Sequence, residues 1–305
     1  LENGASYLGV SIMEEGIELR RAGIAAPILI LGHIFPWNAR EAVKLGLTCM
    51  VATLDLAESL SSAAMSLGKK AKVHVKVDTG MGRIGLSPEE VLNFVTMIYK
   101  LPGLEIEGIC SHLGTVDSDR DLALKQIEKF EDLMSNLENN GYFIPVRHMA
   151  NSAAAMTIPQ ASMNMVRVGM AMYGLSYTGT SIAGPELKPA LAFKTCVEYV
   201  KEVQEGSTIG YNASYISGRE QIVTLPVGYA DGYPRLLSNK GKVLINGEKF
   251  KVVGKVCMDQ MMVSVPIDFK VDIGDEVVLI GDQKGKTIHA EDLALDVGTI
   301  NYEIV

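Results

Sequence analysis

A glycine-rich turn with one lysine, one aspartate and one arginine is the first stretch of the chain suited to chemistry. It reads HVKVDTGMGRIGL over residues 74–86, and Lys76, Asp78 and Arg83 interrupt or follow an apolar run there. Glycine allows a ligand to approach the backbone closely, and the planar guanidinium of arginine pairs well with a carboxylate or a phosphate. The alternative is structural, because the same three charges could form an ion-pair network at a strand end. Residue types and spacing leave both interpretations open.

Two further strand ends carry groups that could bind an anion. Ser111 and His112 end one apolar run, and Asn151 and Ser152 end another at the start of a short predicted helix. A hydroxyl group beside the free N–H groups of a helix N-terminus is suited to an anion. For the second pair the structural alternative is a simple helix N-cap.

A second arginine, Arg167, lies near the end of the apolar run 161–168, and Gly169 and Met170 follow it with backbone amides that could also face an anion. Barrel enzymes commonly bind phosphate near their last two strands. Two arginines, a histidine and a possible phosphate cradle together indicate a phosphorylated ligand that also has a carboxylate.

The elements that must position these residues alternate between strand and helix in the first part of the chain, which is typical of a parallel sheet. About seven strands are predicted, one fewer than in an eight-stranded (β/α) barrel, whose active site lies at the carboxyl ends of the strands. The rival is an open doubly wound sheet, but no GxGxxG follows the first strand. The predicted strands are 6–10, 27–31, 48–52, 72–77, 104–110, 146–150 and 161–168, and the predicted helices are 13–22, 36–45, 56–67, 88–100, 120–139 and 152–157.

The pattern changes after residue 184, where short Val-rich runs are separated by turn signals such as Asn246-Gly247. This pattern predicts a second, all-β domain. We therefore expect domains at 1–184 and 185–305, joined through a Gly-, Ser- and Pro-containing linker at 178–189. Three segments of the second domain are polar and aromatic, at 208–215, 228–239 and 253–263, and their structural alternative is ordinary turns. The predicted strands are 196–203, 221–227, 242–245, 250–256, 261–265 and 276–280, with a helix at 287–298.

Composition excludes several classes of function. The 305 residues are 48% hydrophobic and 21% charged, with a net charge of −8. This composition favours a globular protein and gives no broad basic field for nucleic acid. The four cysteines are far apart and form no CxxC pair, so we expect no metal site, no disulfide framework and a reducing, cytoplasmic location. No apolar run reaches the length of a membrane span.

Seven segments, in order along nearly the whole chain, resemble the alanine racemase family. They are KVDTGMGRIG, MANSAA, VRVGMAMYG, IGYNASY, LPVGYADGYPR, VGKVCMDQMMV and TINYE. The resemblance implies an enzyme dependent on pyridoxal phosphate (PLP), with a (β/α)8 barrel of fold type III and a C-terminal β domain. It also implies interconversion of L- and D-alanine for bacterial peptidoglycan, in a homodimer whose active sites are shared between subunits.

The resemblance assigns three residues to proton transfer. Tyr211 corresponds to a phenol that removes or returns the substrate proton on one face. Arg83 and His112 correspond to groups that support this phenol, and Arg83 also supports the substrate carboxylate. Lys76 resembles a lysine that is often carbamylated, which would give an anion able to pair with Arg83.

The resemblance also implies how the coenzyme is held. Arg167 matches an arginine that faces the pyridine nitrogen, where it donates a hydrogen bond without giving up its proton. The ring then remains a weaker electron sink, which favours racemisation over transamination. Asn151, Ser152, Gly169, Met170 and Tyr302 match the phosphate-binding region. Met258 and Tyr229 match positions that line the substrate and its entry channel, and the partner subunit would supply Tyr211, Tyr229 and Met258.

One part of the family pattern is missing. The family's second base is a lysine that also bonds PLP, in a segment of the type Lys–Ala–x–Ala–Tyr–Gly–His–Gly, and this sequence contains no such segment. The chain opens at Leu1 and stops at Val305 inside a predicted strand, so we expect missing sequence at both ends. We also expect these 305 residues alone to be inactive.

The alternatives are a serine or broad-specificity racemase, and an inactive PLP-binding or dimerising fragment. A related decarboxylase of diamino acids is disfavoured, because such enzymes carry an acidic group where Arg167 stands.

Overall fold

The structure, a computed structural model, describes residues 2–176 and 186–305. Among these residues the chain forms two compact units, the first ending at Gly169 and the second beginning at Met170. The predicted domain boundary at 184/185, and much of the predicted linker, lie outside the described residues. Each unit has its own hydrophobic core.

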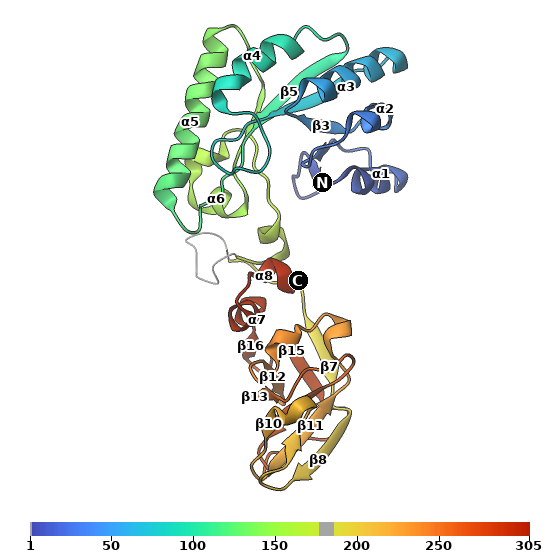
Figure 1. The fold of residues 1–305 in the computed structure, drawn as a ribbon, viewed down its shortest axis with the longest axis vertical. Coiled ribbons are helices and arrows are strands. Elements are labelled where there is room, and N and C mark those ends of the chain that lie inside the picture. The colour runs from blue at the N-terminus through green and yellow to red at the C-terminus, as the bar shows by residue number, and fades with distance from the viewer. Residues whose placement is uncertain (1, 177–185) are drawn as a thin grey trace. The chain divides into compact units, whose positions relative to one another are not determined.

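The first unit contains a six-stranded parallel sheet in which the strands follow their order in the sequence (Figure 1). This half-barrel of alternating strands and helices confirms the α/β architecture expected from the sequence. Its strands are β1 (Leu8–Val10), β2 (Ile28–Ile30), β3 (Thr48–Val51), β4 (Ala71–Lys76), β5 (Leu104–Cys110) and β6 (Val146–His148). Its helices are α1 (Met13–Arg21), α2 (Ala39–Lys44), α3 (Leu54–Leu67), α4 (Pro88–Ile98), α5 (Arg120–Asn139) and α6 (Ser152–Thr157), with short 3₁₀ helices η1 (Pro36–Asn38) and η2 (Pro159–Ser162).

The alternation of residues in β4 serves two purposes. Val73 and Val75 are fully buried and join the core that includes Phe130 of α5. Successive side chains of a strand point to opposite faces, so His74 and Lys76 lie on the other face of the sheet, where they are also buried. This strand therefore stabilises the fold with one face and delivers polar groups with the other.

The predicted strand at 161–168 is wrong. The chain there forms η2, and residues 163–169, all of them described, form no strand. The side chain of Asn164 takes the place of a strand partner for β6: its Oδ1 accepts the N–H of Arg147 at 2.7 Å and its Nδ2 donates to the carbonyl of Pro145 at 2.7 Å. An apolar run alone cannot reveal that a side chain makes the hydrogen bonds that the backbone of a neighbouring strand would otherwise make.

The second unit is mostly antiparallel β-structure, as expected. Its larger sheet has eight strands in the order β16-β15-β12-β13-β14-β11-β8, with β7 paired to β15, and β9 pairs with β10. The strands are β7 (Phe193–Cys196), β8 (Tyr199–Val203), β9 (Thr208–Ile209), β10 (Tyr215–Ile216), β11 (Glu220–Leu225), β12 (Lys242–Ile245), β13 (Glu248–Val253), β14 (Met261–Val265), β15 (Glu276–Gln283) and β16 (Lys286–Ile288). The helices are α7 (Ala290–Val297) and α8 (Asn301–Ile304), and the 3₁₀ helices are η3 (Met170–Tyr173), η4 (Tyr211–Ala213), η5 (Tyr229–Asp231) and η6 (Arg235–Leu237).

Three expectations in this unit need correction. The predicted strand 196–203 is two strands, because Val197 and Glu198 between β7 and β8 bond to different neighbours, Asp275 and Thr224. The predicted helix 287–298 begins later, after β16. The end of the chain is helix α8 and not a strand, since the buried Asn301 uses its side chain to bond Ser176 and Glu291, both at 2.7 Å.

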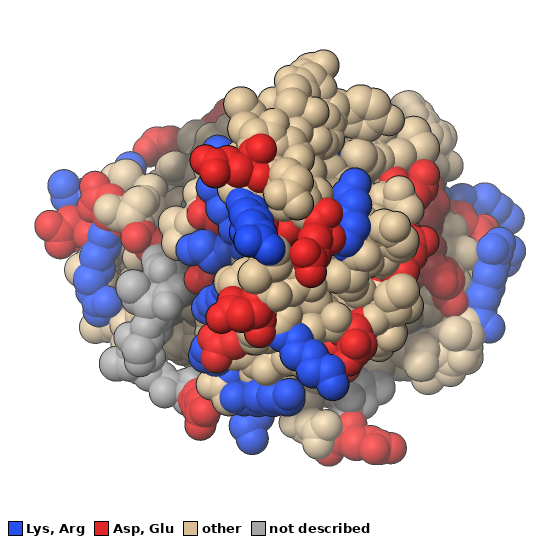
Figure 2. Space-filling view, turned by 90° about the horizontal axis from the view of Figure 1, so that it is seen from below, with Lys and Arg blue, Asp and Glu red and all other residues tan. Residues whose placement is uncertain are grey.

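The surface carries charges of both signs. On the face drawn in Figure 2, Lys and Arg are interspersed with Asp and Glu and do not gather in one patch. Across residues 2–176 and 186–305, no helix is both long enough and apolar enough to cross a membrane.

A core substitution should separate the two units. Phe130→Ala removes a fully buried ring of α5 and is expected to cost about 3–5 kcal/mol. Hydrogen exchange measured by peptide should then speed up in the first unit only. Val263→Ala, in the core of the second unit, is the matched control and should act there alone. A loss of protection in both units from either variant would contradict the division.

Candidate active site

Arg167 is the central polar residue at the carboxyl ends of β5 and β6. Its Nη2 donates to the carbonyl of Ser111 at 2.9 Å and that of Met149 at 3.2 Å, and lies 3.2 Å from His112 Nδ1. Its Nη1 lies 2.5 Å from Nδ1 of His148. Burial, opposed by Cys110 and reinforced by the charge of Arg83, lowers the pKa of Arg167. The guanidinium thus ties three segments together at one point.

His112 is a neutral imidazole of defined tautomer. Burial, with the charges of Arg167, Arg83 and Lys76, lowers the pKa of His112 to about 4. Because a guanidinium has no acceptor, Nδ1 of His112 accepts from Arg167, and the ring proton is therefore on Nε2. His112 consequently offers one N–H donor on the side of the ring away from Arg167.

Lys76 ends β4 in a buried position. Among the described residues its Nζ donates one hydrogen bond, to the carbonyl of Val77 at 2.9 Å. Burial is the main cause that lowers the pKa of Lys76; Arg167 and Arg83 add to it, and Cys110 and Asp78 oppose it. A lowered pKa makes the neutral amine more accessible than in an ordinary lysine.

The turn after β4 is organised by its backbone and not by an ion-pair network. Oδ1 of Asp78 accepts the N–H groups of Gly80 and Met81, both at 2.8 Å. Burial opposes ionisation of Asp78, but backbone hydrogen bonds outweigh it and lower its pKa. Within the part of the chain that the structure describes, no ion pair joins Lys76, Asp78 and Arg83, so the structural alternative for these charges is not found. The side chain of Arg83 is exposed.

The start of α6 brings two of the predicted residues together. Oγ of Ser152 accepts the N–H of Gly169 at 2.9 Å. Asn151 caps the helix, with Oδ1 accepting from Ala154 N at 3.0 Å, and its Nδ2 donates to the carbonyl of Leu113 at 3.3 Å. The N-cap interpretation is therefore confirmed for Asn151.

Three other predicted residues stand on loops of the second unit. The side chains of Tyr211, Tyr229 and Met258 are 67%, 41% and 54% exposed. The loops of the last two are joined by backbone bonds, Tyr229 N to Cys257 O at 3.0 Å and Ala230 N to Met258 O at 2.9 Å. A Cβ on Gly228 would lie 2.2 Å from the Met258 carbonyl oxygen, so this approach requires glycine.

The loop of Tyr211 is tied to the same group. Asn239 donates to the carbonyl of Ser214 at 3.2 Å and accepts from Gly254 N at 2.7 Å, which links the Tyr211 loop to the segment that leads to Met258. Met170 and Tyr302 also belong to the second unit, in η3 and α8. The structure thus groups Lys76, Arg83, His112, Asn151, Ser152, Arg167 and Gly169 in the first unit, and Tyr211, Tyr229, Met258, Met170 and Tyr302 in the second.

Three residues on one side of Arg167 were not identified from the sequence. They are two buried histidines, His148 and His74, and Glu107, which lies next to His74. A signal was present in β4, where Lys72, His74 and Lys76 alternate with valine. Polar residues at every second position of a buried strand indicate a polar interior face.

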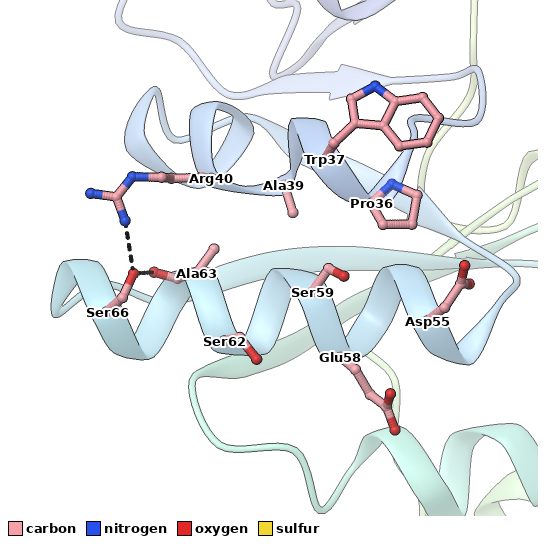
Figure 3. Close-up of a pocket in the computed structure, with 10 residues that line it drawn as sticks. All are labelled: Pro36, Trp37, Ala39, Arg40, Asp55, Glu58, Ser59, Ser62, Ala63 and Ser66. Atoms are coloured by element: carbon pink, nitrogen blue, oxygen red, sulfur yellow. Dashed lines mark hydrogen bonds between the residues drawn. The ribbon is translucent and has the colours of Figure 1, made fainter.

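An open groove of about 610 Å³ lies between the η1–α2 segment and α3 (Figure 3). Its lining is Pro36, Trp37, Ala39, Arg40, Asp55, Glu58, Ser59, Ser62, Ala63 and Ser66. None of these residues is a predicted site residue, and we assign no ligand to it. In the described ranges no three or more His, Cys, Asp or Glu side chains are placed to hold a metal ion, and the four cysteines are free thiols.

Both parts of the chain match models of one family. The model described as "Alanine racemase, N-terminal domain" matches residues 1–177, and "Alanine racemase, C-terminal domain" matches residues 190–305. This chain belongs to the alanine racemase family. Alanine racemases are PLP-dependent isomerases that supply D-alanine for peptidoglycan.

Individual relatives agree along the whole chain. The alanine racemase of Symbiobacterium thermophilum is 47% identical over all of this chain and 81% of its own length. A solved alanine racemase from Clostridium difficile 630 is 39% identical with a TM-score of 0.89, over 99% of this chain and 79% of its own. An alanine racemase from Bacillus anthracis, solved with bound L-Ala-P, is 37% identical with a TM-score of 0.89, over 99% and 79%.

The donors of this alanine racemase chain fit PLP. Arg167 has five N–H groups, and its Nε–H and one Nη1–H have no partner among the described residues. A pyridine nitrogen, which is an acceptor, suits such a donor. The Ser152–Gly169 contact provides a hydroxyl and a backbone amide of the kind that binds phosphate.

Acid should destabilise the fold partly through His112. Its folded-state pKa of about 4 lies below the ordinary 6.5, so the unfolded chain binds a proton that the folded chain does not. The free energy of unfolding should fall as pH decreases from about 6.5 to 4, by about 1 kcal/mol from this residue after screening. Urea unfolding of the wild type and His112→Gln across this range measures the difference. Identical pH dependence in both would contradict it.

Proposed function

We propose that the protein interconverts L- and D-alanine, with PLP held at Arg167 and with residues of two subunits at each site. The observation that carries the proposal is the half-buried guanidinium of Arg167, which has N–H groups without a partner among the described residues and neutral groups as its hydrogen-bond partners. The Bacillus anthracis relative solved with bound L-Ala-P supports alanine as the substrate.

The coenzyme contacts follow from the chemistry of each group. PLP, when bound, withdraws electrons from the α-carbon of the substrate and so makes its proton removable. Arg167 would donate to the pyridine nitrogen. Ser152, Gly169 and Met170 would hold the phosphate through a hydroxyl and backbone amides, with Tyr302 beside them and Asn151 fixing the start of α6.

Proton transfer on one face is assigned to Tyr211 of the partner subunit. An ordinary phenol has a pKa of about 10 and needs help to act as a base near neutral pH. His112 would supply that help, because its Nε2–H can donate to a phenolate oxygen, and the cation of Arg83 would favour the same anionic form. The high exposure of Tyr211, Tyr229 and Met258 supports their burial against a second copy of the chain.

The base for the other face is not within this sequence. The 305 residues contain no Lys–Ala–x–Ala–Tyr–Gly–His–Gly-type segment, and Lys76 is assigned another role. A polypeptide made of these residues alone should therefore not racemise alanine.

Substrate choice and location are further parts of the proposal. Tyr229 and Tyr302 would narrow the pocket and favour a small side chain. Serine differs from alanine by one hydroxyl, and apolar pockets reject such a change only modestly, so we expect slower racemisation of serine. The relatives are bacterial, and together with the free cysteines they support a bacterial cytoplasmic protein.

The decisive experiment compares the 305-residue chain with the same chain preceded by a family-type lysine segment with its strand and helix. The longer protein should bind PLP, retain it covalently after borohydride reduction, and convert L-alanine to D-alanine faster than L-serine. The shorter chain should not retain PLP after borohydride reduction and should not form D-alanine. Failure of the longer, folded protein to bind PLP would overturn the proposal, as would racemisation by the shorter one.

In the longer protein, Tyr211→Phe should lower the rate constant for racemisation about 10²-fold or more, because a positioned acid–base group is lost. Tyr199→Phe is the control, since Tyr199 is an exposed tyrosine of β8 outside the loop group. An unchanged rate in Tyr211→Phe would remove this residue from the mechanism.

Lys76 is proposed to react with CO₂. Its neutral amine attacks the carbon of CO₂: a C–N bond forms, the electron pair of one C=O π bond moves to oxygen, and the nitrogen loses a proton to solvent to give a carbamate anion. Burial favours the neutral amine. The protein equilibrated with ¹³C-bicarbonate should show one carbamate signal by NMR that is lost in Lys76→Gln and kept in the exposed Lys70→Gln control. Its persistence in Lys76→Gln would place the modification elsewhere.

A further inference from the structure

A row of buried hydrogen bonds continues from Arg167 into the interior of the first unit. His148 Nδ1 lies 2.5 Å from Nη1 of Arg167, and His148 Nε2 lies 2.8 Å from His74 Nδ1. His74 Nε2 in turn lies 3.4 Å from Oε2 of Glu107. Both histidine side chains are 0% exposed, so water does not supply alternative partners.

The chemistry of Arg167 fixes the direction of every bond in this row. A guanidinium can only donate, so Nδ1 of His148 is an acceptor and the ring proton of His148 is on Nε2. That proton is donated to His74, whose Nδ1 must then be an acceptor with its own proton on Nε2. The last proton faces the carboxylate of Glu107. Both rings are therefore neutral, because a second proton on either would set two donors against each other.

Glu107 ends the row as an ionised acceptor. The hydrogen bond from His74, opposed by burial and aided by Lys72 and Tyr7, lowers the pKa of Glu107 to about 2. Lys72 Nζ donates to its Oε1 at 2.6 Å, and the hydroxyl of Tyr7 donates to its Oε2. The carboxylate thus has partners on both oxygens and is held in one orientation.

The backbone of β5 is shaped to admit this arrangement. In the pairing with β4, Val73 is opposite Ile106 and His74 is opposite Gly108, so Glu107 is the extra residue of a β-bulge. A bulge redirects a side chain within a sheet. A Cβ on Gly108 would lie 2.6 Å from ring atoms of His74, so the histidine ring occupies the space that any other residue would fill.

We propose that Glu107, His74 and His148 are positioning residues that fix the guanidinium of Arg167. A donor-only guanidinium at one end and a carboxylate acceptor at the other fix both histidine tautomers, and the acceptor on His148 holds one Nη1–H of Arg167, which leaves the Nε–H without a partner among the described residues and available to a ligand. The inference rests on the coenzyme-binding role proposed above for Arg167. It adds that this role depends on a carboxylate three hydrogen bonds away.

The first test is the tautomeric state of the histidines in the 305-residue protein without PLP, read by NMR of ¹⁵N-labelled rings at pH 7. The chain has five histidines, and His33→Gln, His112→Gln and His289→Gln identify the remaining two signals. Both His74 and His148 should be neutral with the proton on Nε2. A proton on Nδ1 of either ring, or a charged ring, would overturn the inference.

Substitutions at Glu107 test its control of the row. Glu107→Leu removes the acceptor, so the His74 Nε2 signal should change and its proton should exchange with water at least about tenfold faster. Glu107→Gln retains an acceptor oxygen and should keep the tautomers while shifting the same proton signal. Glu105→Gln is the matched control, because Glu105 on the same strand pairs with Lys70 at 3.6 Å and has no bond to His74. Equal spectra for Glu107→Leu and Glu105→Gln would contradict the proposal, and Glu107→Gln covers the case in which the leucine variant does not fold.

A kinetic measurement separates positioning from mere structural support. In the longer protein, Glu107→Leu should lower kcat about fivefold with KM unchanged within about twofold, while Glu107→Gln, which keeps an acceptor oxygen, restores most of the rate and Glu105→Gln leaves both constants unchanged. Unchanged kcat in a folded Glu107→Leu variant, or equal losses in Glu107→Leu and Glu107→Gln, would refute the positioning role. The tautomer measurement requires neither PLP nor activity. Failure of the proposed racemase function can therefore be told apart from failure of the positioning inference.

Discussion

A half-buried guanidinium that can only donate hydrogen bonds, that of Arg167, determines the polar interior of the first unit. Burial of an unpaired charge is costly unless hydrogen bonds compensate for the lost water. Here the compensation comes from neutral acceptors, two backbone carbonyls and two imidazole nitrogens. Because Arg167 offers no acceptor, each imidazole that touches it must be neutral and of one tautomer. One side chain therefore sets the protonation of His112 and His148 together.

The parallel strands of the first unit bring the other polar residues of the candidate site to Arg167. β4, β5 and β6 end at the same edge of the sheet, so Lys76, His112 and the segment that leads to Ser152 lie around Arg167 without any long loop. The positive charges are not balanced locally, since the carboxylate of Asp78 is used by the turn backbone. A site with excess positive charge suits a phosphorylated ligand with a carboxylate, as PLP with an amino acid is.

The sequence predicted the elements with strong periodicity well. The bounds of β5, α5 and α6 agree with expectation, because long apolar periods and clear caps define them locally. The run 161–168 misled the prediction, since Asn164 supplies from a side chain the bonds that a strand would make. The final residues form a helix and not the predicted strand for a similar reason, since the buried contacts of Asn301 are invisible in the sequence.

The candidate site likewise contains residues that could be identified from the sequence and residues that could not. Its residue types, Arg83, His112, Arg167 and Ser152 among them, were identifiable from the glycine-rich turn, from the ends of predicted strands and from the family resemblance, although the strand predicted before Arg167 does not form. The roles of His74, His148 and Glu107 were not, because a histidine in a buried strand does not reveal its partner. The bulge that directs Glu107 depends on the register between two strands, and register is a property of pairing that local sequence does not encode.

The contact at Gly228 fixes the backbone beneath two exposed side chains of the second unit, Tyr229 and Met258. Two main-chain hydrogen bonds, and a glycine with no room for a methyl group, fix the position of the segment that carries Tyr229 relative to the segment that carries Met258. Neither exposed side chain contributes to that fixation. Residues at 229 and 258 can therefore change in size or polarity at little cost in folding, because the backbone beneath them is held independently of their side chains.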